Sequence, residues 1–225
     1  MNVLIACEES QVVCTAFRER GHRAFSCDLQ ECSGGHPEWH IQGDCLPLIN
    51  GDCQFKTMDG TEHEQRGNWD LLIAHPPCTF LSVAGNRWLD VQKYGEKAIR
   101  RIEERKSAAD FFMKFINADC AKIAVENPRG YMNTHYKKPT QTVYPYLFGE
   151  SNNKPICLWL KGLPALLPTN KVPKGKTHRF PNGKTNSIWW AGKSAKERSR
   201  SFKGIGEAMA EQWGGFQDVQ LSLYD

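Results

Sequence analysis

The chain has 225 residues, 40% of them hydrophobic, so it can bury one good core and carry a small appended lobe. No apolar run approaches the ~18 residues that span a bilayer. The opening segment has neither a basic start nor a small-residue cleavage pattern, so we expect no signal peptide. Nine cysteines, an odd number, favour free thiols in a reducing cytoplasm over a disulfide scaffold.

The net charge of +4 conceals a strong asymmetry. Residues 1–162 carry 19 Lys and Arg against 20 acids, whereas residues 163–203 carry 10 against 1. Positive charge concentrated in one segment rich in Gly and Pro favours a polyanionic partner, most simply a nucleic acid. A solvated basic loop without a partner is the alternative.

Strand and helix patterns alternate along the chain. Short apolar runs predict strands and apolar residues at helical spacing predict helices, in the order strand 1–6, helix 10–20, strand 23–27, strand 70–74, helix 91–117, strand 122–125, strand 156–160 and helix 204–212. This alternation predicts an α/β fold with a doubly wound, mostly parallel sheet. Residues 1–162 and 201–225 would form the main domain, and residues 163–200 a small irregular basic lobe.

Reactive or acidic residues follow the ends of the predicted strands. In doubly wound sheets, ligands gather beyond the carboxyl ends of the strands. Five residues lie at such positions, namely Cys7, Asp28, Asp44, Cys78 and Glu126. Their shared position predicts one site at this edge of the sheet.

Cys78 and Glu126 are the candidate reactive pair. Cys78 follows a strand and two prolines, so its thiol should be exposed on a loop, where it could act as a nucleophile once ionised. Glu126 follows three apolar residues, so burial should raise its pKa and let it share a proton near neutral pH. Asn127 could hold Glu126 or the substrate by hydrogen bonds. The alternatives are a buried structural cysteine, and a carboxylate that caps a helix or pairs with Arg129.

Several segments together carry a family resemblance. The chain resembles the DNA (cytosine-5-)-methyltransferases, especially the short forms of bacteriophages and prophages. The matching segments are Pro76-Pro77-Cys78 with Ser82 and Gly85, Glu126-Asn127, and residues 138–141, 145–149, 157–164 and 200–205. They span most of the chain outside residues 51–66 and 165–195.

The resemblance implies a cofactor and a reaction. The sheet would be of the Rossmann-like type of methyltransferases that use S-adenosyl-L-methionine. Cys78 would add to carbon 6 of a cytosine in DNA while Glu126 protonates or hydrogen-bonds ring nitrogen 3. Carbon 5 would then take the methyl group, a base would remove its proton, and Cys78 would leave. The cytosine must flip out of the base stack. Such an enzyme would be a monomer in the host cytoplasm that shields phage DNA from restriction.

The resemblance also implies a donor site. The residues that it assigns are Ala6, Cys7, Glu8, Glu9, Ser10, Asp28, Asp44, Cys45 and Pro76. The first five stand where the family has a glycine-rich turn, which is a departure from the family pattern. Asp28 matches the acid that binds ribose hydroxyls, and Asp44 matches the acid near the adenine amino group. Either acid could instead be an ordinary loop residue.

Contacts with the target base and with DNA complete the expected site. Lys154 stands near the family's base-holding arginine, although lysine lacks the planar fork of arginine, and a solvent-facing lysine is the alternative. Basic residues would attract phosphates and aromatic residues would stack on bases. The predicted DNA-binding residues are Ser82, Arg87, Arg129, Lys174, Lys176, Arg179, Trp189, Trp190, Arg198 and Arg200. As alternatives to DNA contacts, Arg87 and Arg129 could form ion pairs, and Trp189 and Trp190 could pack the lobe against the core.

Other functions stay open at this point. The same thiol chemistry could modify a free pyrimidine nucleotide, although a mononucleotide does not need so much basic charge. An amino-methyltransferase would not need a nucleophilic thiol. The missing glycines and arginine would also suit an inactive DNA-binding relic. Six residues have spacings that could bind zinc, but no Cys-x-x-Cys pair is among them, so we expect no metal; they are Cys27, Cys32, His36, His40, Cys45 and Cys53.

Overall fold

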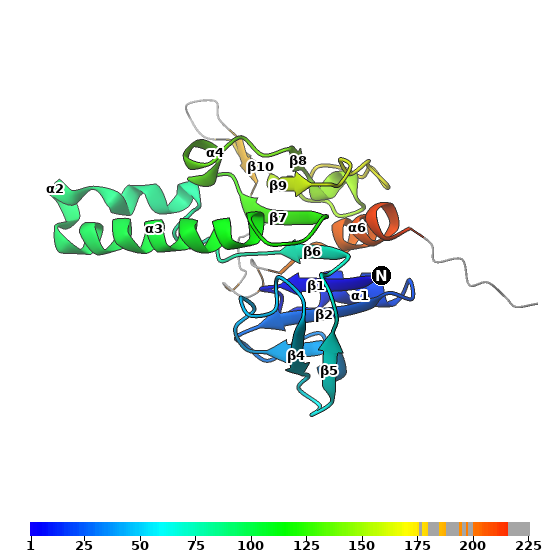
Figure 1. The fold of residues 1–225 in the computed structure, drawn as a ribbon. Coiled ribbons are helices and arrows are strands. Elements are labelled where there is room, and N and C mark those ends of the chain that lie inside the picture. Colours follow the sequence, from blue (N-terminus) through cyan, green and yellow to red (C-terminus); the bar gives the residue numbers. More distant parts are fainter. Residues whose placement is uncertain (176, 180–184, 188–193, 195–196, 198–199, 216–225) are drawn as a thin grey trace, which may run out of the picture.

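The computed structural model describes residues 1–175, 177–179, 185–187, 194, 197 and 200–215. Its centre is a seven-stranded sheet with the strand order β3-β2-β1-β6-β7-β9-β8 (Figure 1). The parallel strands are β1 (Asn2–Ala6), β2 (Arg23–Asp28), β3 (His40–Gln42), β6 (Leu71–Ala74) and β7 (Ile123–Pro128). The strand β9 (Ile156–Lys161) runs antiparallel to both β7 and β8 (Gln141–Val143).

The predicted fold class, a doubly wound and mostly parallel α/β sheet, is confirmed. The chain first builds the sheet outward from β1 through β2 to β3, then returns to β6 on the other side of β1. The strands beside this reversal are buried on both faces, which explains their continuous apolar sequences. Such sheets bind ligands beyond the carboxyl ends of the strands at this reversal, here β1 and β6.

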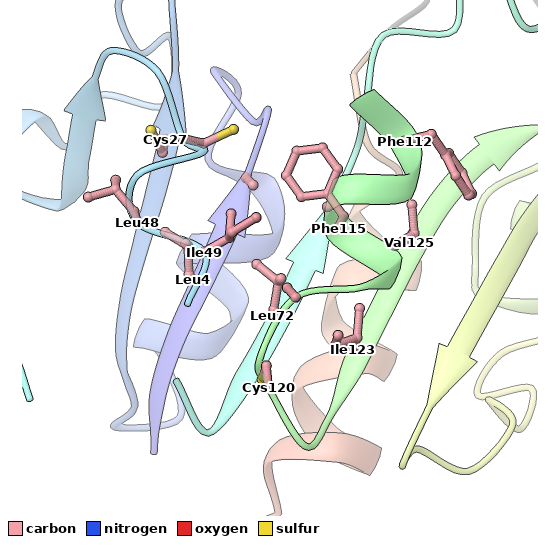
Figure 2. Close-up of a cluster of buried hydrophobic side chains, with 14 of the residues drawn as sticks. Leu4, Cys27, Leu48, Ile49, Leu72, Phe112, Phe115, Cys120, Ile123 and Val125 are labelled. Atoms are coloured by element: carbon pink, nitrogen blue, oxygen red, sulfur yellow. The ribbon is translucent and has the colours of Figure 1, made fainter. Parts of the chain in front are cut away.

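Helices cover both faces of the sheet, because successive strand side chains point to opposite sides. On one face, Phe112 and Phe115 of α3 (Glu96–Ile116) pack over Leu72 and Val125 (Figure 2). On the other face, α1 (Val12–Arg18) and α6 (Lys203–Gly214) pack against each other and against the sheet. The core therefore has two apolar layers with the sheet between them.

Each predicted element lies within a few residues of its expected bounds. The predicted helix 91–117 is divided into α2 (Val91–Tyr94) and α3 at Gly95, whose φ of +53° interrupts the helix. The strands β3 and β8 and the hairpin of β4 (Cys53–Lys56) and β5 (Glu62–Gln65) were not predicted, because they are short or polar. The remaining short elements are η1 (Pro37–Trp39), η2 (Val83–Leu89), α4 (Met132–His135) and η3 (Pro145–Leu147). None of the described helices is long and apolar enough to cross a membrane.

The first residues of the predicted basic lobe contact the main domain. Leu166 is buried in the core, and the indole of Trp213 in α6 donates a hydrogen bond to the carbonyl of Pro164 at 3.0 Å. Ser151 donates to the carbonyl of Pro173 at 2.8 Å. Beyond this point, β10 (Thr177–Arg179) pairs with β11 (Thr185–Ser187) in an antiparallel hairpin.

Candidate active site

The ends of three neighbouring strands form the floor of the candidate site. The register of β1, β6 and β7 aligns their last paired residues, so the residues that follow, Cys7, His75 and Glu126, lie side by side. A cleft with about 880 Å³ of empty space, part of it open to solvent, lies over these ends. Its size is typical of a site for a small molecule.

The cleft has two chemically different halves. One half is lined by carboxylates: Glu8 and Glu9 follow β1, and Asp28 is the last residue of β2. Residues of the loop after β6 and the last residues of β7 line the other half, together with Lys154 and Arg200. Eleven of the predicted catalytic, donor-site and DNA-binding residues line this one cleft: Cys7, Glu8, Glu9, Ser10, Asp28, Pro76, Cys78, Glu126, Asn127, Lys154 and Arg200.

Cys78 lies on the loop after β6 and is exposed. Its carbonyl accepts hydrogen bonds from the N–H groups of Leu81 and Ser82 at 3.1 and 3.0 Å, which closes a turn. Water reaches the residue, but the surrounding protein atoms and the Glu126 carboxylate raise the pKa of the thiol against the opposing charge of Lys154. The thiol is therefore protonated at neutral pH and must lose its proton before it can attack.

Asn127 holds the Cys78 loop in place. The side chain is buried, and its Nδ2 donates a hydrogen bond to the carbonyl of Pro76 at 2.8 Å. This bond connects the end of β7 to the loop after β6. Cys78 follows β6 and Glu126 belongs to β7, so this hydrogen bond fixes the position of Cys78 relative to Glu126.

Glu126 forms an ion pair with His75 on the cleft floor. Nδ1 of His75 lies 3.3 Å from Oε2 of Glu126, and the two side chains are 10% and 22% exposed. Burial disfavours the Glu126 carboxylate, but the hydrogen bond from His75 and the charges of Lys154 and His75 outweigh it and lower the pKa. The predicted rise in the pKa of Glu126 is therefore wrong, because the prediction considered burial and not the pairing with His75 and Lys154.

Glu8 caps α1 at the place where the resemblance implies a glycine-rich turn. Its two carboxylate oxygens accept hydrogen bonds from the N–H groups of Val13 and Cys14 at 2.7 and 3.1 Å. Burial raises the pKa of Glu8, although the charge of His75 and these two bonds oppose the rise. The N-terminus of α1, which could otherwise bind a phosphate, is thus occupied by a side chain of the protein itself.

Replacing Glu8 by alanine should destabilise the protein by about 2 kcal/mol, because two buried N–H groups lose their acceptors. Glu8→Gln keeps one acceptor, so its effect should be about half as large. Urea unfolding of the two variants and the wild type measures both values. Equal stability of all three proteins would show that the cap contributes nothing.

Lys154 brings positive charge to the Glu126 side of the cleft. Its backbone N–H donates to Oδ1 of Asn152 at 2.8 Å, which fixes the turn before β9. Its ammonium lies 5.7 Å from the ring centre of Phe202 and lowers the pKa of Glu126. A cation stands near the position that the resemblance implies, although it is a lysine.

Other predicted donor-site residues differ in their access to the cleft. Ala6 is fully buried, and its carbonyl accepts a hydrogen bond from the His75 N–H at 2.9 Å, so it offers a ligand no surface. The sulfurs of Cys7 and Cys45 lie 3.9 Å apart, and this contact together with burial raises the pKa of Cys7. Cys45 is buried and Asp44 is exposed, and neither lines the cleft.

The predicted DNA-binding residues are spread around the cleft. Arg200 lines it, whereas Arg87 and Arg129 are exposed outside it and Ser82 is half-buried beside Gly130. Lys174 lies 5.4 Å from the ring centre of Tyr146. The residues Lys176, Trp189, Trp190 and Arg198 and the side chain of Arg179 lie outside the described part of the structure.

His75 is the residue of this site that the sequence analysis missed. An ionisable residue directly before two prolines at a strand end is a signal that could have identified it. Within the described residues, no three His, Cys, Asp or Glu side chains converge in a way that could hold a metal ion.

The likeness of this chain to known proteins lies in the fold. No protein-family model matches the sequence, and the search of curated proteins gave no match. The fold is similar to a crystal structure from E. coli, described as a proposed DNA modification methyltransferase encoded within a prophage, with a TM-score of 0.43 and 13% sequence identity. The match covers 77% of this chain, and the chain spans about half (52%) of that structure.

Proposed function

We propose that this protein transfers a methyl group from S-adenosyl-L-methionine to carbon 5 of cytosine in DNA through a covalent bond to Cys78. The observation that carries the proposal is that an exposed thiol and a paired carboxylate from two different strands line one cleft. The motifs that contain Cys78 and Glu126 are also those that carry the sequence resemblance. Shielding of phage DNA from restriction is the biological role that follows from it.

The acidic half of the cleft suits a cationic donor. S-adenosyl-L-methionine carries a sulfonium and an ammonium group and no phosphate. Glu8 already occupies the phosphate-binding position at the start of α1, and Glu9 and Asp28 add carboxylates near it. When bound, the cofactor supplies an activated methyl group. Glu9 and Asp28 would hold it beside the loop of Cys78.

The other half of the cleft suits a flipped cytosine. The Cys78 thiol first gives its proton to water. Its thiolate sulfur then bonds to carbon 6, a proton reaches ring nitrogen 3 through Glu126, and carbon 5 becomes nucleophilic enough to take the methyl group. A base, most simply water, then removes the carbon-5 proton, and the sulfur leaves with its bonding electrons. Lys154 and Arg200 give this half positive charge, which favours the phosphates that flank the flipped base.

Labelled cofactor tests this function directly. Incubation with S-adenosyl-L-methionine carrying a labelled methyl group should label duplex DNA, and digestion should release the label as 5-methylcytosine. A parallel incubation with dCMP should stay unlabelled, whereas label in dCMP alone would favour a nucleotide-modifying enzyme. Label on an exocyclic amino group would contradict the covalent mechanism, and binding of DNA without any labelled product would indicate a relic.

A 5-fluorocytosine oligonucleotide tests the covalent step. Fluorine at carbon 5 cannot leave as a proton, so the sulfur cannot depart after methyl transfer and the adduct should accumulate. A denaturing gel measures the adduct as a protein band that carries the oligonucleotide. The matched control is the same oligonucleotide with cytosine in place of 5-fluorocytosine, which should give no stable band.

A further inference from the structure

We propose that His75 holds the proton that Glu126 delivers to ring nitrogen 3 of the target cytosine. His75 would thus be a positioning residue that acts through Glu126 and does not touch the substrate. This inference rests on the proposed function, because it concerns the proton that the cytosine must receive. It assigns a role to a residue that the sequence resemblance leaves without one.

The first support is the geometry of the pair. His75 directly follows the last residue of β6, and its backbone N–H donates to the carbonyl of Ala6 in β1 at 2.9 Å. This bond fixes the backbone of His75 between two strands. The ring is almost completely buried, and its Nδ1 lies 3.3 Å from Oε2 of Glu126. The proton therefore has a short and fixed path between the two side chains.

The second support is the charge around the imidazole. The groups that face His75 are Glu126 on β7, Glu8 after β1, Lys154 before β9 and Arg200 before α6. Burial lowers the pKa of His75, but the hydrogen bond to Glu126 and the charges of Glu126 and Glu8 outweigh burial and Lys154 and raise it. At pH 6.5 and just below, the free protein thus has an imidazolium beside a carboxylate.

A carboxylate alone has no proton to give at neutral pH. Because the pKa of Glu126 is lowered, this side chain is ionised in the free protein, and the proton for the cytosine must come from a neighbour. His75 is the residue that donates a hydrogen bond to Glu126. The proton for the reaction is therefore held on His75, and Glu126 lies between His75 and the substrate.

The proton movements balance in both directions. As the Cys78 thiolate bonds to carbon 6, Glu126 gives a proton to ring nitrogen 3 and takes one from Nδ1 of His75, which becomes neutral. After carbon 5 has taken the methyl group, the ring is a cationic amidine and returns the nitrogen-3 proton through Glu126 to His75. Elimination of the carbon-5 proton and of the sulfur then completes the turnover.

The variant His75→Asn tests this role, because an asparagine amide can donate near the Nδ1 position but cannot supply a proton. Adduct formation on 5-fluorocytosine DNA is followed in a single turnover from pH 5 to pH 9. In the variant, Glu126 must carry the proton itself, so the ratio of wild-type to variant rate should grow by up to about tenfold per pH unit as pH rises toward neutrality. A purely structural role would lower the rate by the same factor at every pH.

The matched control is His36→Asn. His36 also pairs with a carboxylate, Glu38, at 3.0 Å, but this pair is exposed and outside the cleft. Its rate should equal that of the wild type at every pH. DNA binding by fluorescence anisotropy and cofactor binding by calorimetry should be unchanged in both variants.

Two outcomes separate this inference from the proposed function. If the wild type forms an adduct and the rate ratio does not change with pH, the role of His75 is overturned and the proposed function stands. If the wild type forms no adduct at any pH, the proposed function fails and the role of His75 fails with it. Nitrogen NMR of the free protein adds a readout without DNA: a neutral His75 ring at pH 6.5 would also overturn the inference.

Discussion

Replacing Cys78 by alanine is expected to abolish methyl transfer, with a loss in single-turnover rate on the order of 10⁶-fold, as for other covalent nucleophiles. The physical reason is that carbon 5 of cytosine becomes nucleophilic only after the sulfur has bonded to carbon 6. Alanine removes the sulfur from an exposed loop, so the fold and DNA binding should persist. The labelled-cofactor assay and the 5-fluorocytosine gel measure the loss.

The control for this variant is Cys53→Ala. Cys53 is a free thiol in β4, which belongs to the small hairpin outside the seven-stranded sheet. This variant should keep the wild-type rate and form the adduct normally. Methyl transfer by Cys78→Ala at more than a tenth of the wild-type rate would exclude the covalent mechanism and favour an amino-methyltransferase.

Replacing Glu126 by glutamine should lower the rate by about 10²- to 10⁴-fold, because an amide cannot transfer a proton to ring nitrogen 3. The variant also leaves His75 without its carboxylate. Breaking a buried ion pair costs about 3–5 kcal/mol when the remaining charge is trapped. His75 can instead release its proton, so we expect a smaller loss of stability, which urea unfolding measures.

The pH dependence of stability gives an independent check on this pair. The raised pKa of His75 stabilises the fold fully below its ordinary value of 6.5, and this contribution is lost as pH rises through the raised value. The lowered pKa of Glu126 stabilises the fold above its ordinary value of 4.5, and this contribution is lost as pH falls through the lowered value. The difference in stability between wild type and Glu126→Gln should therefore be largest between these values.

The control for Glu126→Gln is Glu38→Gln, which removes the carboxylate of the exposed pair with His36. Exposed pairs contribute little, so both the rate and the stability should stay close to those of the wild type. A Glu126→Gln enzyme with the full wild-type rate would contradict the role of the carboxylate in proton delivery.

Local sequence patterns predicted most strands of the sheet and the exposed loop that carries Cys78. Apolar runs predicted β1, β2, β6, β7 and β9, because strands buried on both faces need such sequences. The helix division at Gly95 and the short strands β3 and β8 were not predicted, since three-residue strands leave no periodic signal. The first residues of the predicted lobe look irregular in sequence, and the contact of Pro164 with Trp213 of α6 could not be read from it.

By itself, the sequence determined the fold class and the position of Cys78 after a strand and two prolines, because both depend on residues close together in the chain. Only the tertiary structure decided the partner of Glu126, because His75 and Glu126 are 51 residues apart and meet through the register of β6 and β7. The same holds for Glu8, whose role as a helix cap depends on how the chain turns from β1 into α1. The protonation state of each group in the cleft depends on which charged groups lie next to it. The order and register of the strands determine those neighbours.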